Sequence, residues 1–232
     1  MAIRVLSAGA VECMMEAIGH EFEKASGEAL DIEFATVGAL RKRLEAGEQA
    51  DLVALSESAI TALDTAGRFV PGSVTHLGKT VTGVAVKAGA PKPDISTVEA
   101  FKQALLGARG VSYPDPAGGG SSGIFLSAFF EKAGIAARIG KIAVLKPRGF
   151  NVAQALISGE AEIGITFVSE FLSVPGVTVV GPLPPGAENI NTYTAAIPAA
   201  SRQQAKAAAF LKALTDPAAR DRWSAAGLEP AF

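Results

Sequence analysis

The chain has 232 residues, 49% of them hydrophobic, so it is long and apolar enough for one or two globular domains with a buried core. The formal net charge is −2 and no basic block is present, which argues against nucleic acid or an anionic membrane as the main partner. The single cysteine, Cys13, excludes an internal disulfide, and His20 and His76 stand too far apart for a metal site, so we expect neither a metal nor a cofactor. No apolar run reaches the roughly 18 residues of a membrane span, so we expect no membrane insertion.

The first third of the chain alternates predicted strands and helices. Apolar or alternating segments bounded by small residues predict strands, and apolar residues at a spacing of three or four predict helices. The predicted strands are Ile3–Gly9, Leu30–Ala35 and Ala50–Ser56, and the predicted helices are Val11–Gly27, Val37–Gly47 and Glu57–Phe69. This rhythm is typical of an α/β fold with a mainly parallel sheet.

The remainder continues in the same way after a β-rich run at Lys79–Lys87. Further predicted strands are Gly110–Asp115, Lys141–Lys146, Ala161–Ser169, Val177–Pro184 and Asn191–Ala199, and the predicted helices are Thr97–Gly107, Ser121–Gly134 and Phe150–Gly159. A helix pair closes the chain, with Pro217 opening the second helix.

Two segments that are distant in the sequence have a similar pattern. Leu40–Ser56 and Val152–Ser169 share a helix, a Gly-Glu turn and a buried strand. Either an internal duplication or a chance similarity between two α/β units explains this shared pattern. Duplication would give two similar lobes, and a small molecule would then bind between them, beyond the carboxyl ends of the strands.

Four loops precede predicted helices at such strand ends: Ser7–Glu12, Ala35–Leu40, Asp115–Phe125 and Lys146–Asn151. Helix N-termini carry unpaired amides and favour negative charge, so these loops are candidate anion sites. In "DPAGGGSSGIF", Ser121 or Ser122 is expected to cap the helix that follows. The loop is not a phosphate-binding P-loop, because no lysine follows the glycines.

Each of these features also has a plainer interpretation. The glycine-rich loop is a site or a flexible turn, and Arg148 is a bidentate carboxylate clamp or a solvated surface residue. Phe167 belongs to the core or to the wall of a cleft, and Thr36 is a helix N-cap. Glu12 is a helix-dipole partner or, if it faces the ligand, a general base. A helix start could lower the pKa of the Cys13 thiol, although a buried hydrophobic role is the simpler reading.

The chain resembles a known family through "IRVLSAGAVECMMEAIGHEFEKASG" and "FATVGALRKRLEAGEQADLVALSE". These segments are similar to the molybdate-binding proteins of bacterial ABC importers, and the likeness runs nearly end to end. It implies the type II periplasmic-binding-protein fold, an α/β fold of two lobes, each a mixed sheet flanked by helices, with the ligand cleft between them. Residues 1–80 and 195–232 would form lobe 1 and residues 81–194 lobe 2, joined by crossover strands near Thr80–Val84 and Asn191–Ala195.

The resemblance also implies a site. The family's first oxyanion-binding serine falls at Ala10, its second at Thr36–Gly38, and its aromatic hydroxyl at Phe167. The chain therefore lacks three hydroxyl donors that a tetrahedral oxyanion would use, which favours a planar carboxylate. The expected ligand-binding residues are Gly9, Ala10, Val11, Thr36, Val37, Gly38, Ser121, Ser122, Arg148, Gly149, Phe150, Asn151 and Phe167.

The implied function is the binding of a small anion, an oxyanion such as molybdate or an organic carboxylate, by a monomer that works with an ABC permease. The N-terminus lacks the pattern of a secretory leader, so the chain as given is expected in the cytoplasm, or in the periplasm if a leader has been removed. A sister group of this fold resembles aconitate isomerase, so a cytoplasmic isomerase of an unsaturated organic acid is an alternative. The candidate acid/base groups of such an isomerase are Glu12 and, after it, Cys13. A third possible function is that of a cytoplasmic ligand sensor.

Overall fold

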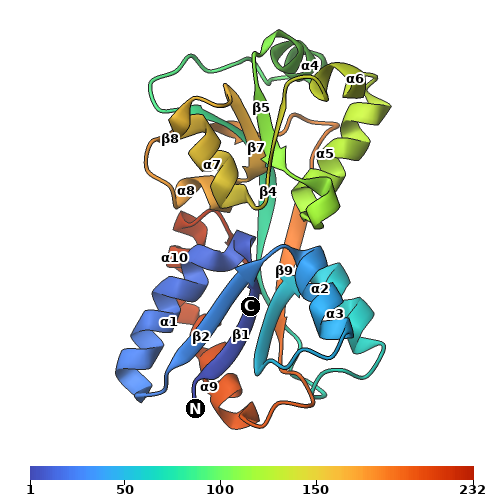
Figure 1. Cartoon of the computed structure of the whole chain (residues 1–232). Coiled ribbons are helices and arrows are strands. Elements are labelled where there is room, and N and C mark those ends of the chain that lie inside the picture. The colour runs from blue at the N-terminus through green and yellow to red at the C-terminus, as the bar shows by residue number, and fades with distance from the viewer. The chain divides into compact units, whose positions relative to one another are not determined.

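The computed structural model covers residues 1–232 and divides into two compact units. Unit 1 comprises Met1–Thr80 and Asn191–Phe232, and unit 2 comprises Val81–Ile190 (Figure 1). The chain leaves unit 1 along strand β4 (Thr75–Lys87) and returns along β9 (Ile190–Ala196). No helix combines the length and the apolar character that crossing a membrane requires.

The sheet of unit 1 combines parallel and antiparallel pairs. Strand β1 (Ile3–Ala8) runs parallel to β2 (Leu30–Ala35) on one side and to β3 (Leu52–Ser56) on the other. Strand β9 is antiparallel to β3, and β10 (Glu229–Pro230) is antiparallel to the first part of β4. Ala8 pairs with Ala35, so the loops after β1 and β2 leave the sheet side by side.

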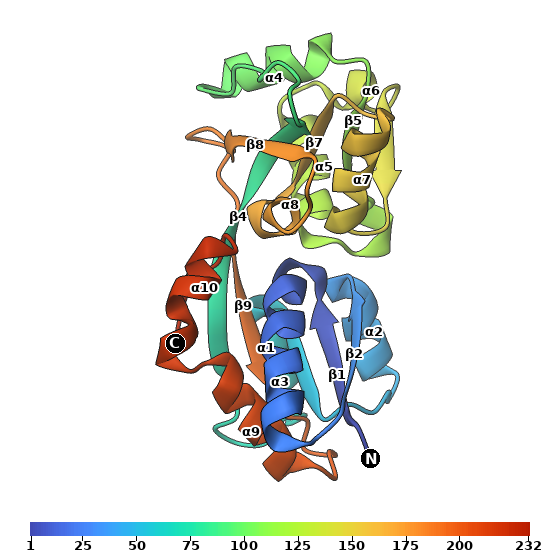
Figure 2. The same cartoon turned by 90° about the vertical axis from the view of Figure 1, so that its left-hand side faces the viewer.

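Helices cover both faces of this sheet (Figure 2). A core cluster joins Leu6 and Val53 of the sheet to Leu40 and Leu44 of α2, which lie one helical turn apart. The opposite face carries α1, whose Phe22 ring lies 5.1 Å from that of Phe210 on α9. The helical elements of unit 1 are η1 (Gly9–Val11), α1 (Glu12–Ser26), α2 (Val37–Glu45), α3 (Glu57–Asp64), α9 (Gln204–Leu214), η3 (Pro217–Ala219) and α10 (Arg220–Ala225).

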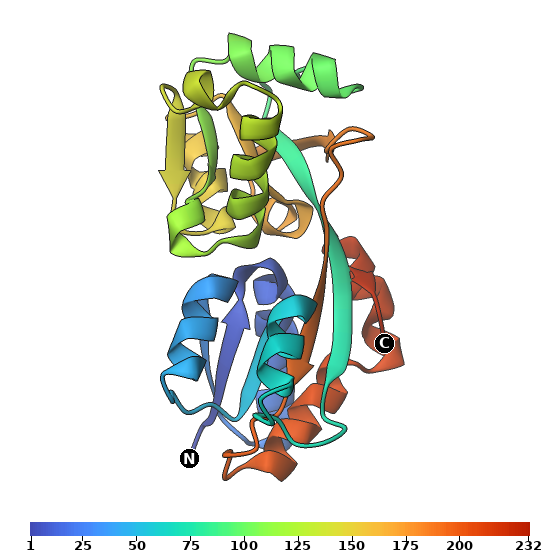
Figure 3. The ribbon, with the colours of Figure 1, turned by 90° about the vertical axis from the view of Figure 1, so that its right-hand side faces the viewer.

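Unit 2 repeats the scheme around three parallel strands. Strand β5 (Val111–Pro114) is parallel to β6 (Ala143–Lys146) and to β7 (Ile163–Phe167). The second part of β4 is antiparallel to β7 and to β8 (Val177–Pro182). The helical elements are α4 (Val98–Gly107), η2 (Pro116–Gly118), α5 (Ser121–Lys132), α6 (Ala136–Ile139), α7 (Gly149–Ser158) and α8 (Val168–Leu172) (Figure 3).

Two hydrophobic clusters hold these helices to opposite faces of the unit 2 sheet. Phe101, Leu126 and Phe130 attach α4 and α5 to one face, and Val152 and Leu156 attach α7 to the other. The rings of Tyr113 and Phe130 meet edge to face at 5.4 Å between centroids. Each unit therefore has its own core, as expected for a folding unit of this size.

The α/β class and its mixed sheets with flanking helices are confirmed. The expectation of a mainly parallel sheet is only half right, because β4 and β9, which connect the units, pair antiparallel with their neighbours. Strand β4 begins at Thr75, four residues before the predicted run. The short helices α6 and α8 were not predicted, because one turn of helix leaves too little apolar periodicity to recognise.

Candidate functional site

In unit 1, the loops after β1 and β2 both lead into helices. Gly9, Ala10 and Val11 form the 3₁₀ turn η1 that opens α1, and Glu12 is the first residue of α1, where a carboxylate complements the helix dipole. The Thr36 hydroxyl accepts a hydrogen bond from the Ala39 amide at 3.2 Å, so the prediction that Thr36 caps α2 is confirmed. Two helix starts therefore lie next to each other at one edge of the unit 1 sheet.

Val37 and Gly38 occupy the first turn of α2. The Val37 side chain packs against the core cluster of unit 1, and Ala10 and Val11 are buried. The Ala10 and Val11 side chains are therefore not available to a ligand. This matches a site built from amides rather than from side chains.

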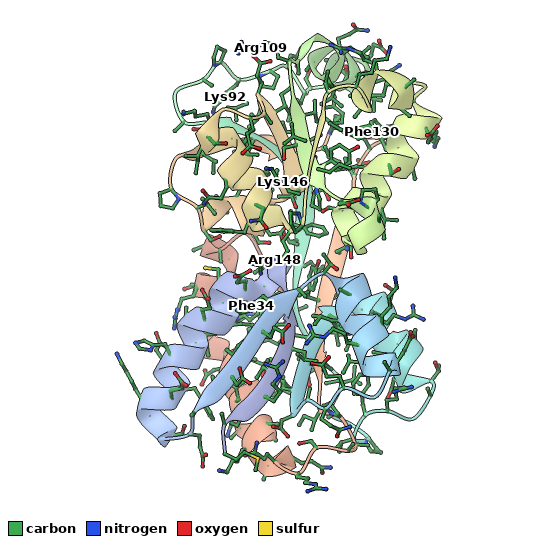
Figure 4. All side chains as sticks on the ribbon, viewed as in Figure 1. Phe34, Lys92, Arg109, Phe130, Lys146 and Arg148 are labelled. Atoms are coloured by element: carbon green, nitrogen blue, oxygen red, sulfur yellow. The ribbon has the colours of Figure 1, made fainter.

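Unit 2 gathers three helix starts at one edge in the same way. Strands β5, β6 and β7 are parallel, so α5, α7 and α8, which follow them, all begin at the carboxyl edge of the sheet. Figure 4 shows Lys146 and Arg148 at this end of unit 2, with Lys92 and Arg109 at the opposite end. The expected site residues of this unit, from Ser121 to Phe167, are therefore brought together by the topology.

The glycine-rich stretch is an ordered connection. The Asp115 carboxylate accepts a hydrogen bond from the Ala117 amide at 2.9 Å, and Gly119 adopts a left-handed conformation with φ of 76°. Gly120 then stands at the N-cap of α5, and no side chain caps this helix. The prediction that Ser121 or Ser122 is the cap is wrong, because both serines already lie in the first helical turn.

Gly123 fixes the start of α5 against the end of β5. A Cβ at this position would overlap the carbonyl oxygen of Pro114 and would lie 2.9 Å from its carbonyl carbon. The helix can approach the strand so closely only because residue 123 has no side chain. The amides of the first turn of α5 are thereby held at the sheet edge.

A chain of polar groups crosses this edge of unit 2. The Ser122 and Thr166 hydroxyls lie 3.3 Å apart, and the Thr166 hydroxyl donates to the Glu170 carboxylate at 2.5 Å. Ser122 and Thr166 are buried, whereas Glu170 is half-buried. The Glu170 carboxylate lies against Gly149, the first residue of α7, and fills the space that a Cβ there would need.

The sequence analysis did not identify Thr166 or Glu170. A polar residue inside the apolar run of β7 was the available signal, because a buried hydroxyl needs a partner. Glu170 gave no signal of its own, since an acidic residue in the first turn of a helix is common.

The remaining expected residues surround α7 and α8. Arg148 is the N-cap residue of α7 with an extended backbone, and Phe150 and Asn151 follow in the first turn. Phe150 is exposed, and its aromatic ring is therefore accessible from the site edge. Phe167 is only 3% exposed, which agrees with the core interpretation of this residue.

The candidate Cys13 thiol and the His76 imidazole, to which no role was assigned, have defined surroundings. Burial raises the pKa of the Cys13 thiol, and Glu16 adds to this effect, so the thiol is not activated by its position at a helix start. The imidazole of His76 lies 3.1 Å from the Thr194 hydroxyl, remote in sequence from every expected site loop. Neither residue contributes to the helix-start geometry described above.

Two α/β units, each with helix starts gathered at the carboxyl edge of its sheet, define a type II periplasmic-binding-protein fold. The model of the family "Bacterial extracellular solute-binding protein" matches residues 3–229. The chain belongs to this family.

Individual relatives differ in what their names say they bind or do. The chain is 34% identical to an aconitate isomerase from Pseudomonas sp, over 98% of this chain and 87% of the relative. Its structure is similar to the Azotobacter vinelandii periplasmic molybdate-binding protein, with a TM-score of 0.80, 19% identity and coverage of 97% of this chain and 98% of the other. A periplasmic thiamin-binding protein gives a TM-score of 0.76 at 15% identity, covering 99% of this chain and 83% of the other. These two structural likenesses establish the fold alone.

Proposed function

We propose that the chain binds a small anion, best matched by an organic carboxylate, as the solute-binding protein of an ABC importer. The observation that carries this proposal is the gathering of helix starts at the carboxyl edge of the sheet in each unit. Unpaired amides and the helix dipole favour a negatively charged ligand. The proposed site comprises the thirteen residues named above, which lie at the helix starts of unit 1 and of unit 2.

The supply of hydroxyl groups favours a carboxylate over a tetrahedral oxyanion. Ala10 and Phe167 have no hydroxyl. The Ser122 hydroxyl faces Thr166. A tetrahedral dianion would thus lack several donors, at about 1–3 kcal/mol for each unpaired oxygen in a dry site. A carboxylate needs fewer donors and suits a guanidinium such as that of Arg148.

The test is a thermal-shift screen of di- and tricarboxylates, molybdate, tungstate, sulfate and phosphate, followed by calorimetry of the ligands that stabilise the protein. A bound ligand raises stability by RT ln(1 + [L]/Kd), or about 2.7 kcal/mol at one hundred times Kd. We expect one or more carboxylates to give the largest shift. A shift with molybdate or tungstate alone would replace the carboxylate by an oxyanion, and no shift with any anion would contradict the proposal.

A second candidate function is isomerisation of an unsaturated organic acid. The 34% identity with an aconitate isomerase, over nearly the whole chain, favours it. Such a reaction removes a proton from one carbon and returns a proton to another, so it needs a carboxylate site and an acid/base group. Glu12, at the start of α1, is the proposed group.

The two candidates are separated by incubating the protein with cis-aconitate or trans-aconitate and following each isomer by proton NMR. Interconversion that Glu12→Gln slows without loss of ligand binding would establish the isomerase. Binding without interconversion would leave the transport function. A periplasmic location is part of the transport proposal, and a leader encoded upstream, together with recovery from the periplasmic fraction, would support it.

A further inference from the structure

A carboxylate of the protein, that of Glu170, lies against Gly149, one of the residues of the proposed anion site. Glu170 lies in the first turn of α8, and its carboxylate extends to the first residue of α7. A Cβ at position 149 would overlap one carboxylate oxygen and would lie 2.6 Å from the other. Glu170 is therefore set beside the backbone to which an anion would bind.

The buried Thr166 orients this carboxylate. Its hydroxyl donates to Oε2 of Glu170 at 2.5 Å, and it lies 3.3 Å from the Ser122 hydroxyl at the start of α5. Thr166 is fully buried on β7, so it has little freedom to move. The position of the Glu170 carboxylate is thus defined by the strand rather than by solvent.

An ionised carboxylate accepts hydrogen bonds and donates none. Beside a ligand O–H group it forms a charge-assisted hydrogen bond, which is about twice as strong as a neutral one. The group therefore discriminates between ligands of similar size and charge.

We propose that Glu170 is a specificity-determining residue, which makes the site prefer anions carrying an O–H donor beside their negative charge over matched anions without one. This inference rests on the proposed function and narrows its ligand to hydroxy acids or monoprotonated oxyanions. Thr166 is the positioning residue for the Glu170 carboxylate.

Calorimetry with two matched ligand pairs tests the inference: malate against succinate, and citrate against tricarballylate. The members of each pair differ by one hydroxyl group. The wild-type protein is expected to bind the hydroxylated member about ten- to a hundredfold more tightly. In Glu170→Gln this ratio is expected to fall at least fivefold, because a neutral amide oxygen accepts a weaker hydrogen bond than a carboxylate does.

Glu162→Gln is the matched control. It removes the same charge from the same unit, but Glu162 precedes β7 and is paired with Arg109 at the other end of the strand. The Glu162→Gln variant is expected to show the same ratio of affinities for the hydroxylated and non-hydroxylated acids as the wild type. Thr166→Val, which retains the volume of the side chain, is expected to give an intermediate ratio.

The outcomes separate the inference from the proposed function. A wild-type protein that binds these acids with the same ratio as Glu170→Gln would overturn the inference and leave the function intact. A wild-type protein that binds none of the four but binds another anion of the screen would overturn the inference alone, and one that binds no anion at all would overturn both. If Glu170→Gln does not fold, the wild type alone decides: hydrogen phosphate, which carries an O–H group, should bind more tightly than sulfate, and the reverse order would overturn the inference.

Discussion

Substitution of Gly123 by alanine should loosen the start of α5. The new Cβ would overlap the Pro114 carbonyl oxygen and lie 3.3 Å from the Pro116 nitrogen, and all of these atoms belong to the backbone. Normal van der Waals separation requires the helix start to move by roughly 1 Å. Such a shift breaks the 3.3 Å contact between Ser122 and Thr166.

The loss of stability in Gly123→Ala has two sources, the overpacking of the new Cβ and the broken contact between the two hydroxyls. Overpacking contributes about 1–3 kcal/mol and the lost hydroxyl contact about 1 kcal/mol, so we expect a loss of about 3 kcal/mol in the free energy of unfolding. For a chain of this length that corresponds to a fall in Tm of roughly 6–12 °C.

Thermal and urea unfolding followed by far-ultraviolet circular dichroism measure this loss. Gly118→Ala is the matched control, because Gly118 lies in the same loop with no atom within 4 Å of its ideal Cβ. Its stability should be unchanged or higher by up to about 1 kcal/mol, since alanine restricts the unfolded chain. Equal stability of the two variants would refute the packing argument for α5.

Three further predictions concern charge and binding. Arg43 holds the pKa of the Glu33 carboxyl at about 2, below its ordinary value of 4.5, so this pair stabilises the fold above pH 4.5 and the stabilisation is lost as the pH falls towards 2. Because Glu33 is 39% exposed, we expect only about 1 kcal/mol, and Glu33→Gln should remove that part of the acid sensitivity in urea titrations. Ser121→Ala combined with Ser122→Ala should weaken anion binding by about 1–3 kcal/mol, and an unchanged calorimetric affinity would place the loop outside the site. Arg148→Ala should weaken the binding of carboxylates more than that of neutral ligands, and equal losses would show that its charge has no part in binding.

Much of the fold could be predicted because the spacing of apolar residues agrees with the positions of capping and turn residues in this sequence. Leu40 and Leu44 mark the buried face of α2, Thr36 caps it, and the short apolar segments become β1, β3 and β7. The pairing of β4 could not be predicted, because an apolar run does not encode which strand lies beside it.

The helix starts of the candidate site could also be predicted, since each follows a strand. The role of the serines could not, because the N-cap is decided by where helical dihedral angles begin, and here that residue is Gly120. Glu170 escaped prediction for a related reason. Its importance depends on Gly149, which is distant in sequence and whose missing side chain admits the carboxylate.

The most direct test of the central claim is a crystal structure of the protein with the tightest-binding carboxylate from the ligand screen. The account predicts that the carboxylate accepts hydrogen bonds from amides of the first turns of α5 or α7, or from amides of the loops at Gly9–Val11 or Thr36–Gly38. A carboxylate bound elsewhere, with these helix starts open to solvent, would contradict it.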